Sequence, residues 1–176
     1  MKTMGEATEK NYFVIKDIFN VVRPSKRSSK KYLSGDVPFV SSGIFNNGVD
    51  SYKMPKNEED IDKGNCISVS PLTGSTFYQP KDFLGRGGGG SSIILLYNDS
   101  LTENSGLYIA TVIRCLLEQK YEYHDMGNST DIKEEEILLP SIKTPKGIEP
   151  NWKYMESYID NKKTTVNYKI ELLSKM

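Results

Sequence analysis

The chain has 176 residues, enough for one domain with a buried core. Hydrophobic residues make up 37% of it and charged residues 26%, which is typical of a folded protein in water and excludes a disordered chain. Its 23 basic and 23 acidic side chains cancel, which excludes a protein that coats nucleic acid through bulk charge. Any contact with DNA must come from a local basic surface.

Membrane and export signals are missing from the sequence. No apolar run approaches the roughly 18 residues of a membrane span, and the polar first residues lack the apolar centre of a signal peptide. Cys66 lies in a strand-like run and Cys115 on a helical pattern, which favours two buried thiols in a reducing compartment. We expect a cytoplasmic protein without a disulfide.

The first third of the chain predicts a short helix, a basic loop and a hairpin. Apolar residues between positions 13 and 22 have an amphipathic pattern that predicts an opening helix. Residues 23–35 contain no acid and predict a basic loop. Residues 36–43 predict a strand, and Asn46-Asn47-Gly48 predicts a turn into a second strand, because Asn and Gly tolerate positive φ.

The middle of the chain predicts strands separated by turns. The acidic run at 57–64 favours a solvated loop, and residues 65–70 alternate as a half-buried strand does. A turn region at 71–80 follows. The glycine run at 85–90 is too costly in entropy for a regular element, and residues 92–97 predict a buried strand.

Two helices are expected in the rest of the chain. From Ser105, apolar residues at helical spacing predict a helix with Asn104 or Ser105 as its cap; these residues are Leu107, Ile109, Val112, Ile113, Leu116 and Leu117. Residues 137–142 form another short buried run. Pro150 and Asn151 then mark the start of a helical tail. Its apolar positions are Trp152, Met155, Ile159, Val166, Ile170 and Leu173.

Catalytic motifs are not found. His124 is the single histidine and has no second ligand at metal-binding spacing. The glycine run lacks the Lys-Ser/Thr ending of a P-loop and precedes a strand, whereas a cofactor loop follows one. The acidic runs at 58–60 and 134–136 are typical of solvated surfaces, and a methyltransferase Asn-Pro-Pro-Tyr motif is lacking. We expect no catalytic residue, no metal and no cofactor.

Residues suited to DNA contact gather in the basic loop and the turns. Five cations fall within nine residues of the loop, interleaved with serines that can donate to phosphate oxygens. Turn residues with amide or hydroxyl groups can reach base edges, although each is also an ordinary turn former. Gly87 to Gly90 could let the backbone approach DNA closely. The candidates are Arg23, Ser25, Lys26, Arg27, Ser28, Lys30, Lys31, Ser42, Asn46, Asn47, Thr73, Ser75, Tyr78, Arg86, Gly88, Asn128, Ser129 and Thr130.

The order of these segments resembles the target recognition domain of type I restriction-modification specificity subunits, and of related restriction-methylation enzymes. The resemblance is carried most by GDVPFVSSGIFNNGV at 35–49 and GNSTDIKEEEILLP at 127–140, and it spans nearly the whole chain. It implies an α+β fold, with a curved, barrel-like mixed sheet, a packed helix and a C-terminal helical segment. We expect a recognition domain at 1–148 and a spacer, dimerisation or docking segment at 149–176.

The resemblance implies a protein that binds double-stranded DNA and does no chemistry. Family members place a methyltransferase subunit, and in type I systems a restriction subunit, at a target site. A full specificity subunit carries two recognition domains, whereas this chain has one. It therefore resembles a half-subunit, a fragment or a relative that pairs differently, with a homodimer or a second recognition domain as the expected partner of the helical tail.

Two alternatives remain open from the sequence. The chain could be the specificity region of a single-chain restriction-methylation enzyme, in which a proline, a tryptophan and a Met-Glu helix like PNWKYMESYI often end the domain. It could also be a protein-binding or carbohydrate-binding module, whose glycine and aromatic loops would form a ligand groove. Salt-sensitive binding to duplex DNA separates the DNA readers from this second class.

Overall fold

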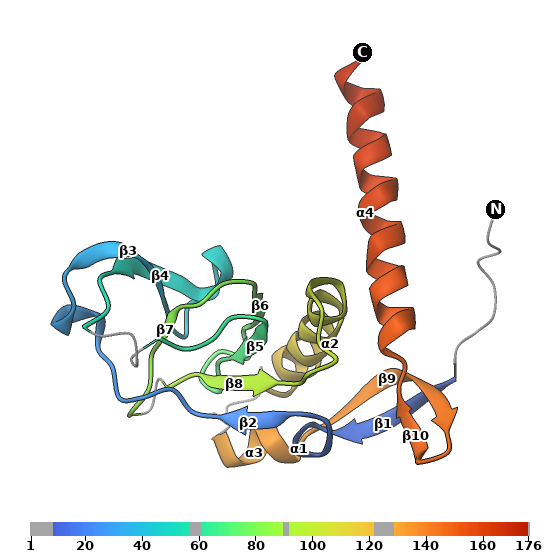
Figure 1. The fold of residues 1–176 in the computed structure, drawn as a ribbon, viewed down its shortest axis with the longest axis horizontal. Coiled ribbons are helices and arrows are strands. Elements are labelled where there is room, and N and C mark those ends of the chain that lie inside the picture. Colours follow the sequence, from blue (N-terminus) through green and yellow to red (C-terminus); the bar gives the residue numbers. More distant parts are fainter. Residues whose placement is uncertain (1–8, 57–60, 90–91, 122–128, 176) are drawn as a thin grey trace.

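The computed structural model describes residues 9–56, 61–89, 92–121 and 129–175. Figure 1 shows a body of strands and helices from which one long helix projects. In chain order the elements are β1 (Lys10–Val14), α1 (Ile15–Ile18), β2 (Asn20–Val22), η1 (Ser29–Lys31), β3 (Ser34–Val40), η2 (Asn46–Gly48), β4 (Val49–Lys53), β5 (Cys66–Val69), β6 (Thr76–Gln79), β7 (Leu84–Gly85), β8 (Ile94–Tyr97), α2 (Glu103–Tyr121), α3 (Ser129–Glu134), β9 (Glu136–Thr144), β10 (Gly147–Pro150) and α4 (Trp152–Ser174).

The central sheet has four antiparallel strands in the order β2-β8-β5-β6. Ile67 and Leu96 face the main core with α2, whereas Cys66 and Leu95 face a second cluster that contains Phe83. Both faces of β5 are therefore buried, and the predicted half-buried strand at 65–70 was wrong in this respect. The apolar run at 92–97 was correctly predicted as a buried strand, since β8 lies between β2 and β5.

A second sheet has the order β4-β3-β7, in which β3 pairs antiparallel with β4 and parallel with β7. The predicted strand–turn–strand is confirmed here. Asn46, Asn47 and Gly48 have φ values of 50°, 56° and 76°, the left-handed region that Asn and Gly enter most readily. These three residues turn the chain from β3 into β4.

The third sheet joins the two ends of the described chain, in the order β1-β9-β10. The predicted opening helix was wrong, because only the single turn α1 is helical between β1 and β2. Long-range pairing explains the difference: β1 pairs with β9, β2 pairs with β8, and the Ile15 amide donates to the Glu135 carbonyl at 2.9 Å. Local apolar periodicity carries no information about these distant partners.

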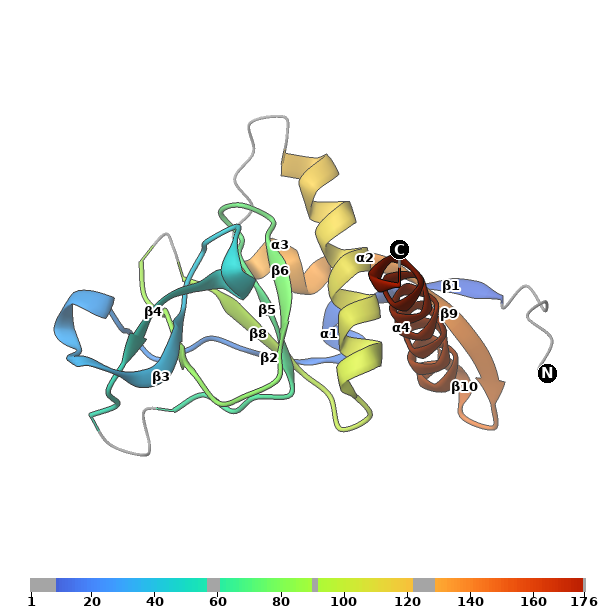
Figure 2. The ribbon, with the colours of Figure 1, turned by 90° about the horizontal axis from the view of Figure 1, so that it is seen from above.

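Helix α2 lies between the central sheet and α4 (Figure 2). Ile109, Ile113 and Leu117 are fully buried, and the other predicted apolar positions pack against the same core. The cap is Thr102 rather than Asn104 or Ser105. Its Oγ1 accepts from the Ser105 amide at 3.3 Å, while Ser105 Oγ accepts from the Thr102 amide at 2.9 Å, as in a capping box.

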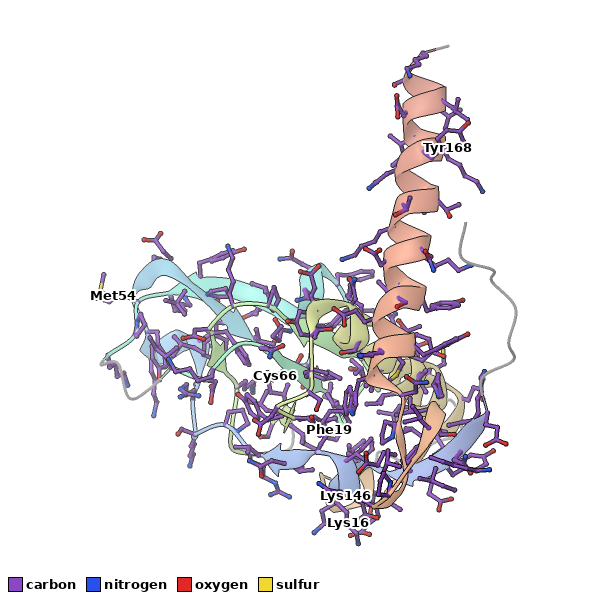
Figure 3. All side chains as sticks on the ribbon, turned by 45° about the vertical axis from the view of Figure 1, so that its right-hand side comes forward. Lys16, Phe19, Met54, Cys66, Lys146 and Tyr168 are labelled. Carbon is purple, nitrogen blue, oxygen red and sulfur yellow. The ribbon has the colours of Figure 1, made fainter. Side chains whose placement is uncertain are left out.

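Helix α4 begins where Pro150 and Asn151 predicted. Asn151 is its N-cap, and its side chain accepts from the Tyr154 amide at 3.1 Å. Met155 is buried, and the Trp152 ring meets Phe19 edge-on at a centroid distance of 6.3 Å. Residues 160–175 are all exposed, and Figure 3 shows Tyr168 far from the body. The domain boundary expected at 148/149 lies inside β10.

The α+β class, the mixed sheet and the C-terminal helix are confirmed, although the three sheets of the described residues do not close into a barrel. Both cysteines are free thiols. Cys66 is buried as expected, but the prediction of a second buried thiol was wrong, because Cys115 lies on the exposed side of α2. Among the described residues, no helix has the length and apolar character of a membrane span.

Candidate nucleic-acid interface

The basic loop connects β2 to β3 at the end of the body farthest from α4 (Figure 1). Lys30 and Lys31 lie on η1, and Arg23 and Lys26 precede it; all four side chains are exposed. Ser25 is exposed beside Lys26, and Ser28 is half-buried. The loop therefore presents four cations and a hydroxyl group to solvent, which is a suitable set for phosphate oxygens.

Arg27 differs from its neighbours, because its side chain is only 3% exposed. Its Nη1 lies 2.7 Å from Asp62 Oδ2 and donates to the Gly85 carbonyl at 3.0 Å. Arg27 was expected among the DNA-facing cations, but its side chain points into the protein. Since Asp62 is 35 residues away along the chain, composition around Arg27 could not reveal the ion pair.

The glycine run packs against the basic loop. The Arg27 amide donates to the Gly87 carbonyl at 3.1 Å, and a Cβ on Gly87 would lie 2.1 Å from the Pro24 carbonyl oxygen. Gly88 has a φ of 81° and contacts the Lys26 side chain. Gly87 therefore allows a close approach between the glycine run and the Pro24–Ser25 backbone, whereas a close approach to DNA was expected. Gly90 lies outside the described residues.

Arg86 lies immediately before these glycines and is half-buried. Its backbone amide donates to the Val40 carbonyl at 2.8 Å, which continues the parallel pairing of β3 and β7. Its Nε is buried and has no hydrogen-bond partner among the residues that the structure describes. Arg86 thus remains a candidate contact beside the basic loop.

The predicted turn residues form a second group, in which loop 41–48 packs against loop 70–79. Ser75 Oγ donates to the Gly43 carbonyl at 3.0 Å, and Thr73 Oγ1 donates to the Ser42 carbonyl at 3.4 Å. Asn47 Nδ2 donates to the Tyr78 carbonyl at 3.0 Å. These hydrogen bonds hold the two loops together.

Two members of this group were expected at the surface and are buried instead. Ser75 is 4% exposed, and Tyr78 is 8% exposed with its hydroxyl donating to Asn65 Oδ1 at 2.9 Å. Turn composition predicted both at a base edge, but their hydroxyl groups find partners inside the protein. Their hydrogen bonds therefore stabilise the loops. Asn46, at the turn of the first loop, is exposed.

The tip of the first loop carries exposed apolar residues that the sequence analysis did not single out. Phe45 is 79% exposed, Ile44 is 49% exposed, and Leu72 of the neighbouring loop is 39% exposed. An apolar side chain at a loop tip can contact a thymine methyl group or insert between base steps. An uncharged Ile-Phe pair directly before Asn-Asn-Gly was the available signal.

Lys30 and Lys31 precede β3, and loop 41–48 follows it, so these two parts lie at opposite ends of the strand (Figure 2). Seven residues at ~3.3 Å each give the strand a length of roughly 23 Å. Arg86 and the paired residues Gly87 and Lys26 lie instead toward the Val40 end of β3. Asn128 lies outside the described residues. Ser129 and Thr130 open α3, which packs against α1. The exposed candidates of the basic loop and of loop 41–48 therefore lie along β3, with Lys30 and Lys31 before the strand and Asn46 after it.

No group of three or more His, Cys, Asp or Glu side chains that could hold a metal ion occurs in the described ranges, and His124 lies outside them. Burial raises the pKa of the Cys66 thiol to about 12, which keeps it protonated.

Solved structures share this fold at low sequence identity. The HsdS subunit from Thermoanaerobacter tengcongensis matches with a TM-score of 0.57 and 14% identity, over 94% of this chain and 40% of that chain. The type I restriction-modification S subunit from M. genitalium matches with a TM-score of 0.54 and 16% identity, over 96% of this chain and 42% of that chain. A chain of a type I restriction-modification assembly gives a TM-score of 0.61 at 13% identity, over 94% and 41% of the two chains.

Sequence comparison adds a curated relative and a family. The type II restriction enzyme BgcI specificity subunit S.BcgI of Heyndrickxia coagulans is 28% identical over 160 residues, which cover 89% of this chain and 44% of that protein. This chain therefore spans less than half the length of that relative. The model for the type I restriction modification DNA specificity domain matches residues 8–173. With nearly its whole length matched, the chain belongs to the type I restriction modification DNA specificity domain family.

Proposed function

We propose that this chain reads double-stranded DNA as the specificity module of a restriction-modification system and directs a methyltransferase subunit, with or without a restriction subunit, to the target site. Family membership supports the proposal. The observation that carries it is the basic loop, in which Arg23, Lys26, Lys30 and Lys31 are exposed on a backbone fixed by the strands behind it. Cations in this setting anchor phosphates and leave base selection to other loops.

The tip of loop 41–48 supplies groups that suit base recognition. Asn46 is exposed at the turn, and an amide can pair with adenine through two hydrogen bonds. Phe45 and Ile44 precede it. Since roughly 23 Å of β3 separates this tip from Lys30 and Lys31, phosphate contact by these lysines and base contact by Asn46 would fall at different points along one duplex.

A salt titration of DNA binding tests the proposal. We expect Lys30→Ala with Lys31→Ala to weaken binding to all duplexes about equally. The log-log salt dependence should also flatten by about 0.9 for each phosphate that the variant no longer neutralises. Fluorescence anisotropy with labelled duplexes measures both quantities. The matched control removes two exposed lysines elsewhere, Lys143→Ala with Lys146→Ala, and should change neither. Salt-insensitive binding by the native chain would favour a module for protein or carbohydrate.

The outer half of α4 supports a partner contact. Its exposed apolar side chains are Val166, Tyr168, Ile170, Leu172 and Leu173. Val166, Ile170 and Leu173 follow one another at steps of four and three residues and so form one stripe, whereas Tyr168 and Leu172 lie on the other side of the helix. An apolar stripe on a projecting helix is typical of helix–helix docking. The curated relative is more than twice as long as the matched part, which leaves room in it for a second unit of this size. We propose that α4 docks on a second recognition unit, supplied in this case by another copy of the chain.

Sedimentation velocity over a range of concentrations tests the docking of α4. We expect a concentration-dependent dimer that Ile170→Asp abolishes, because a carboxylate in an apolar helix interface loses its solvation without gaining a partner. Asn161→Asp adds the same charge at an exposed position on the opposite side of α4 and serves as the control. A monomer at every concentration, unaffected by Ile170→Asp, would contradict the dimer.

We propose further that the chain itself carries out neither methyl transfer nor cleavage. The sequence lacks the cofactor loop and the Asn-Pro-Pro-Tyr motif of a DNA methyltransferase. Incubation with long duplex DNA, Mg²⁺, ATP and a radiolabelled methyl donor should leave the DNA intact and unlabelled until a cognate methyltransferase subunit is added. Label incorporated by the purified chain alone would show it to be an enzyme.

A further inference from the structure

Arg27 and Asp62 join three segments of the chain at the base of the basic loop. Arg27 Nη1 and Asp62 Oδ2 are 2.7 Å apart, and the two side chains are only 3% and 14% exposed. Both side chains also bind Gly85. Arg27 Nη1 donates to the Gly85 carbonyl at 3.0 Å, and the Gly85 amide donates to Asp62 Oδ2 at 2.8 Å. The loop, the strand β7 and the segment around Asp62 are therefore fastened at one point.

Backbone hydrogen bonds hold the same three segments in register. Lys26 pairs with Gly87 as a parallel bridge, and Asp62 pairs with Phe83 as an antiparallel bridge. A Cβ on Gly85 would lie 2.8 Å from Pro24 Cγ and 3.0 Å from Asp62 Oδ2, so the segments are in close contact. The ion pair thus closes a region that is already tightly packed.

The basic loop needs such a fixed point because its own charges repel one another. Four further cations lie within four residues of Arg27 along the chain, and no acid lies among them. Blocks of like charge tend to extend in solution. Asp62 places a counter-charge beneath the loop, and Lys26 points outward while Arg27 points inward.

We propose that Arg27 and Asp62 are a positioning pair: they hold the basic loop in the shape that binds DNA, and Arg27 acts on DNA binding without touching DNA. This inference rests on the proposed DNA-reading function. The proposal predicts that removing the charge of Asp62 weakens DNA binding, whereas charge alone predicts tighter binding. Removing an acid beside a DNA-binding loop strengthens phosphate attraction on charge grounds, whereas loss of a positioning pair weakens binding.

The sign of the effect of Asp62→Asn is therefore the test. We expect the variant to bind duplex DNA at least about tenfold more weakly than the native chain, although the loss of a carboxylate makes the protein more positive. Asp36→Asn is the matched control, because Asp36 is an exposed acid that follows the basic loop on β3. It adds the same charge and should bind equally well or more tightly. Asp62→Asn binding that matches or exceeds the native affinity would overturn the proposal.

A second measurement uses the native protein and is independent of variant folding. Phenylglyoxal modifies accessible arginines, and mass spectrometry locates the product with and without duplex DNA. We expect Arg23 to react in the free protein and to be protected by DNA, and Arg27 to stay unmodified in both states. An Arg27 that reacts when free and is protected by DNA would overturn the proposal. Absence of any salt-sensitive binding by the native chain would instead reject the DNA-reading function itself.

Discussion

Gly87 lies where the basic loop and the glycine run touch. A Cβ at this position would be 2.1 Å from the Pro24 carbonyl oxygen and 2.2 Å from the Ser25 carbonyl oxygen, so the backbone would have to move apart. We expect Gly87→Ala to lower the free energy of unfolding by about 3 kcal/mol, the upper range for overpacking a tight site. Urea denaturation followed by circular dichroism measures the change.

Gly89 provides the control for Gly87. Its φ is 74°, but a Cβ there would meet nothing within 4 Å. Gly89→Ala should therefore cost only the backbone strain of a left-handed residue, about 1 kcal/mol. Equal losses for the two variants would show that the contact with Pro24 and Ser25 does not restrict position 87.

The two thiols should differ sharply in reactivity. Burial raises the pKa of Cys66 to about 12, and Cys115 is exposed on α2. We expect iodoacetamide at pH 8 to label Cys115 within minutes and to leave Cys66 unlabelled until the protein unfolds. Peptide mass spectrometry distinguishes the two sites, and labelling in urea is the control. Rapid labelling of Cys66 in the native state would contradict its burial.

The same pKa shift has a defined effect on stability. The folded-state pKa of Cys66 lies above its ordinary value of 9.0, so the folded protein holds this proton more tightly than the unfolded chain does. The protonated thiol therefore contributes its full stabilisation below about pH 9. That contribution decreases as the pH rises from about 9 toward 12.

At the scale of single residues, the sequence showed where charged and polar side chains gather, but not which of them point to solvent and which point into the protein. It identified the basic loop, and four of the five cations are exposed. Arg27 could not be separated from them, because its partner Asp62 comes from a distant segment. Ser75 and Tyr78 were assigned to DNA contact from their turn positions, although both are buried and their hydroxyl groups donate to Gly43 and Asn65 of other loops.

Among the elements, α4 offers a direct test of a sequence signal. The Asn151 side chain caps the Tyr154 amide, so Asn151→Ala should lower the free energy of unfolding by about 1 kcal/mol. Asn167→Ala makes the same change at an exposed position inside α4, where alanine is the better helix former, and should be neutral or slightly stabilising. Thermal unfolding of both variants measures the difference, and equal effects would argue against the cap.

Elements with local signals were predicted well, and elements defined by distant partners were not. The Asn-Asn-Gly turn, the cap of α4 and the apolar run of β8 carry their information within a few residues. Strands β1 and β2 were taken for one helix, since their apolar residues also fit a helical face. Burial of β5 on both faces depends on α2 and on the Phe83 cluster, which the pattern at 65–70 does not contain.

For the whole molecule, the pairing of β1 with β9 joins distant parts of the chain. Asn11 Nδ2 donates to Ser141 Oγ at 2.8 Å, and Ser141 Oγ donates to the Glu9 carbonyl at 3.1 Å. Ser141 is 6% exposed. We expect Ser141→Ala to cost about 1–3 kcal/mol, because it leaves the Asn11 amide without this acceptor in a partly buried position.

A double-mutant cycle with Asn11→Ala separates this interaction from other effects of either change. If the side chains act through their hydrogen bond, Asn11→Ala with Ser141→Ala should destabilise by less than the sum of the two single variants. Ser157→Ala, on the exposed surface of α4, controls for the loss of a hydroxyl group. Strictly additive losses would show that the two positions contribute independently.

The β1–β9 pairing also determines when the fold can be completed during synthesis. Asn11 and Ser141 are 130 residues apart, so at roughly 5–20 residues per second β1 leaves the ribosome several seconds to tens of seconds before its partner exists. Meanwhile the central sheet, whose strands all lie between residues 20 and 97, can form around α2. Strand β1 must remain an unpaired edge during this interval, and its docking is expected to be the slow, final step of folding.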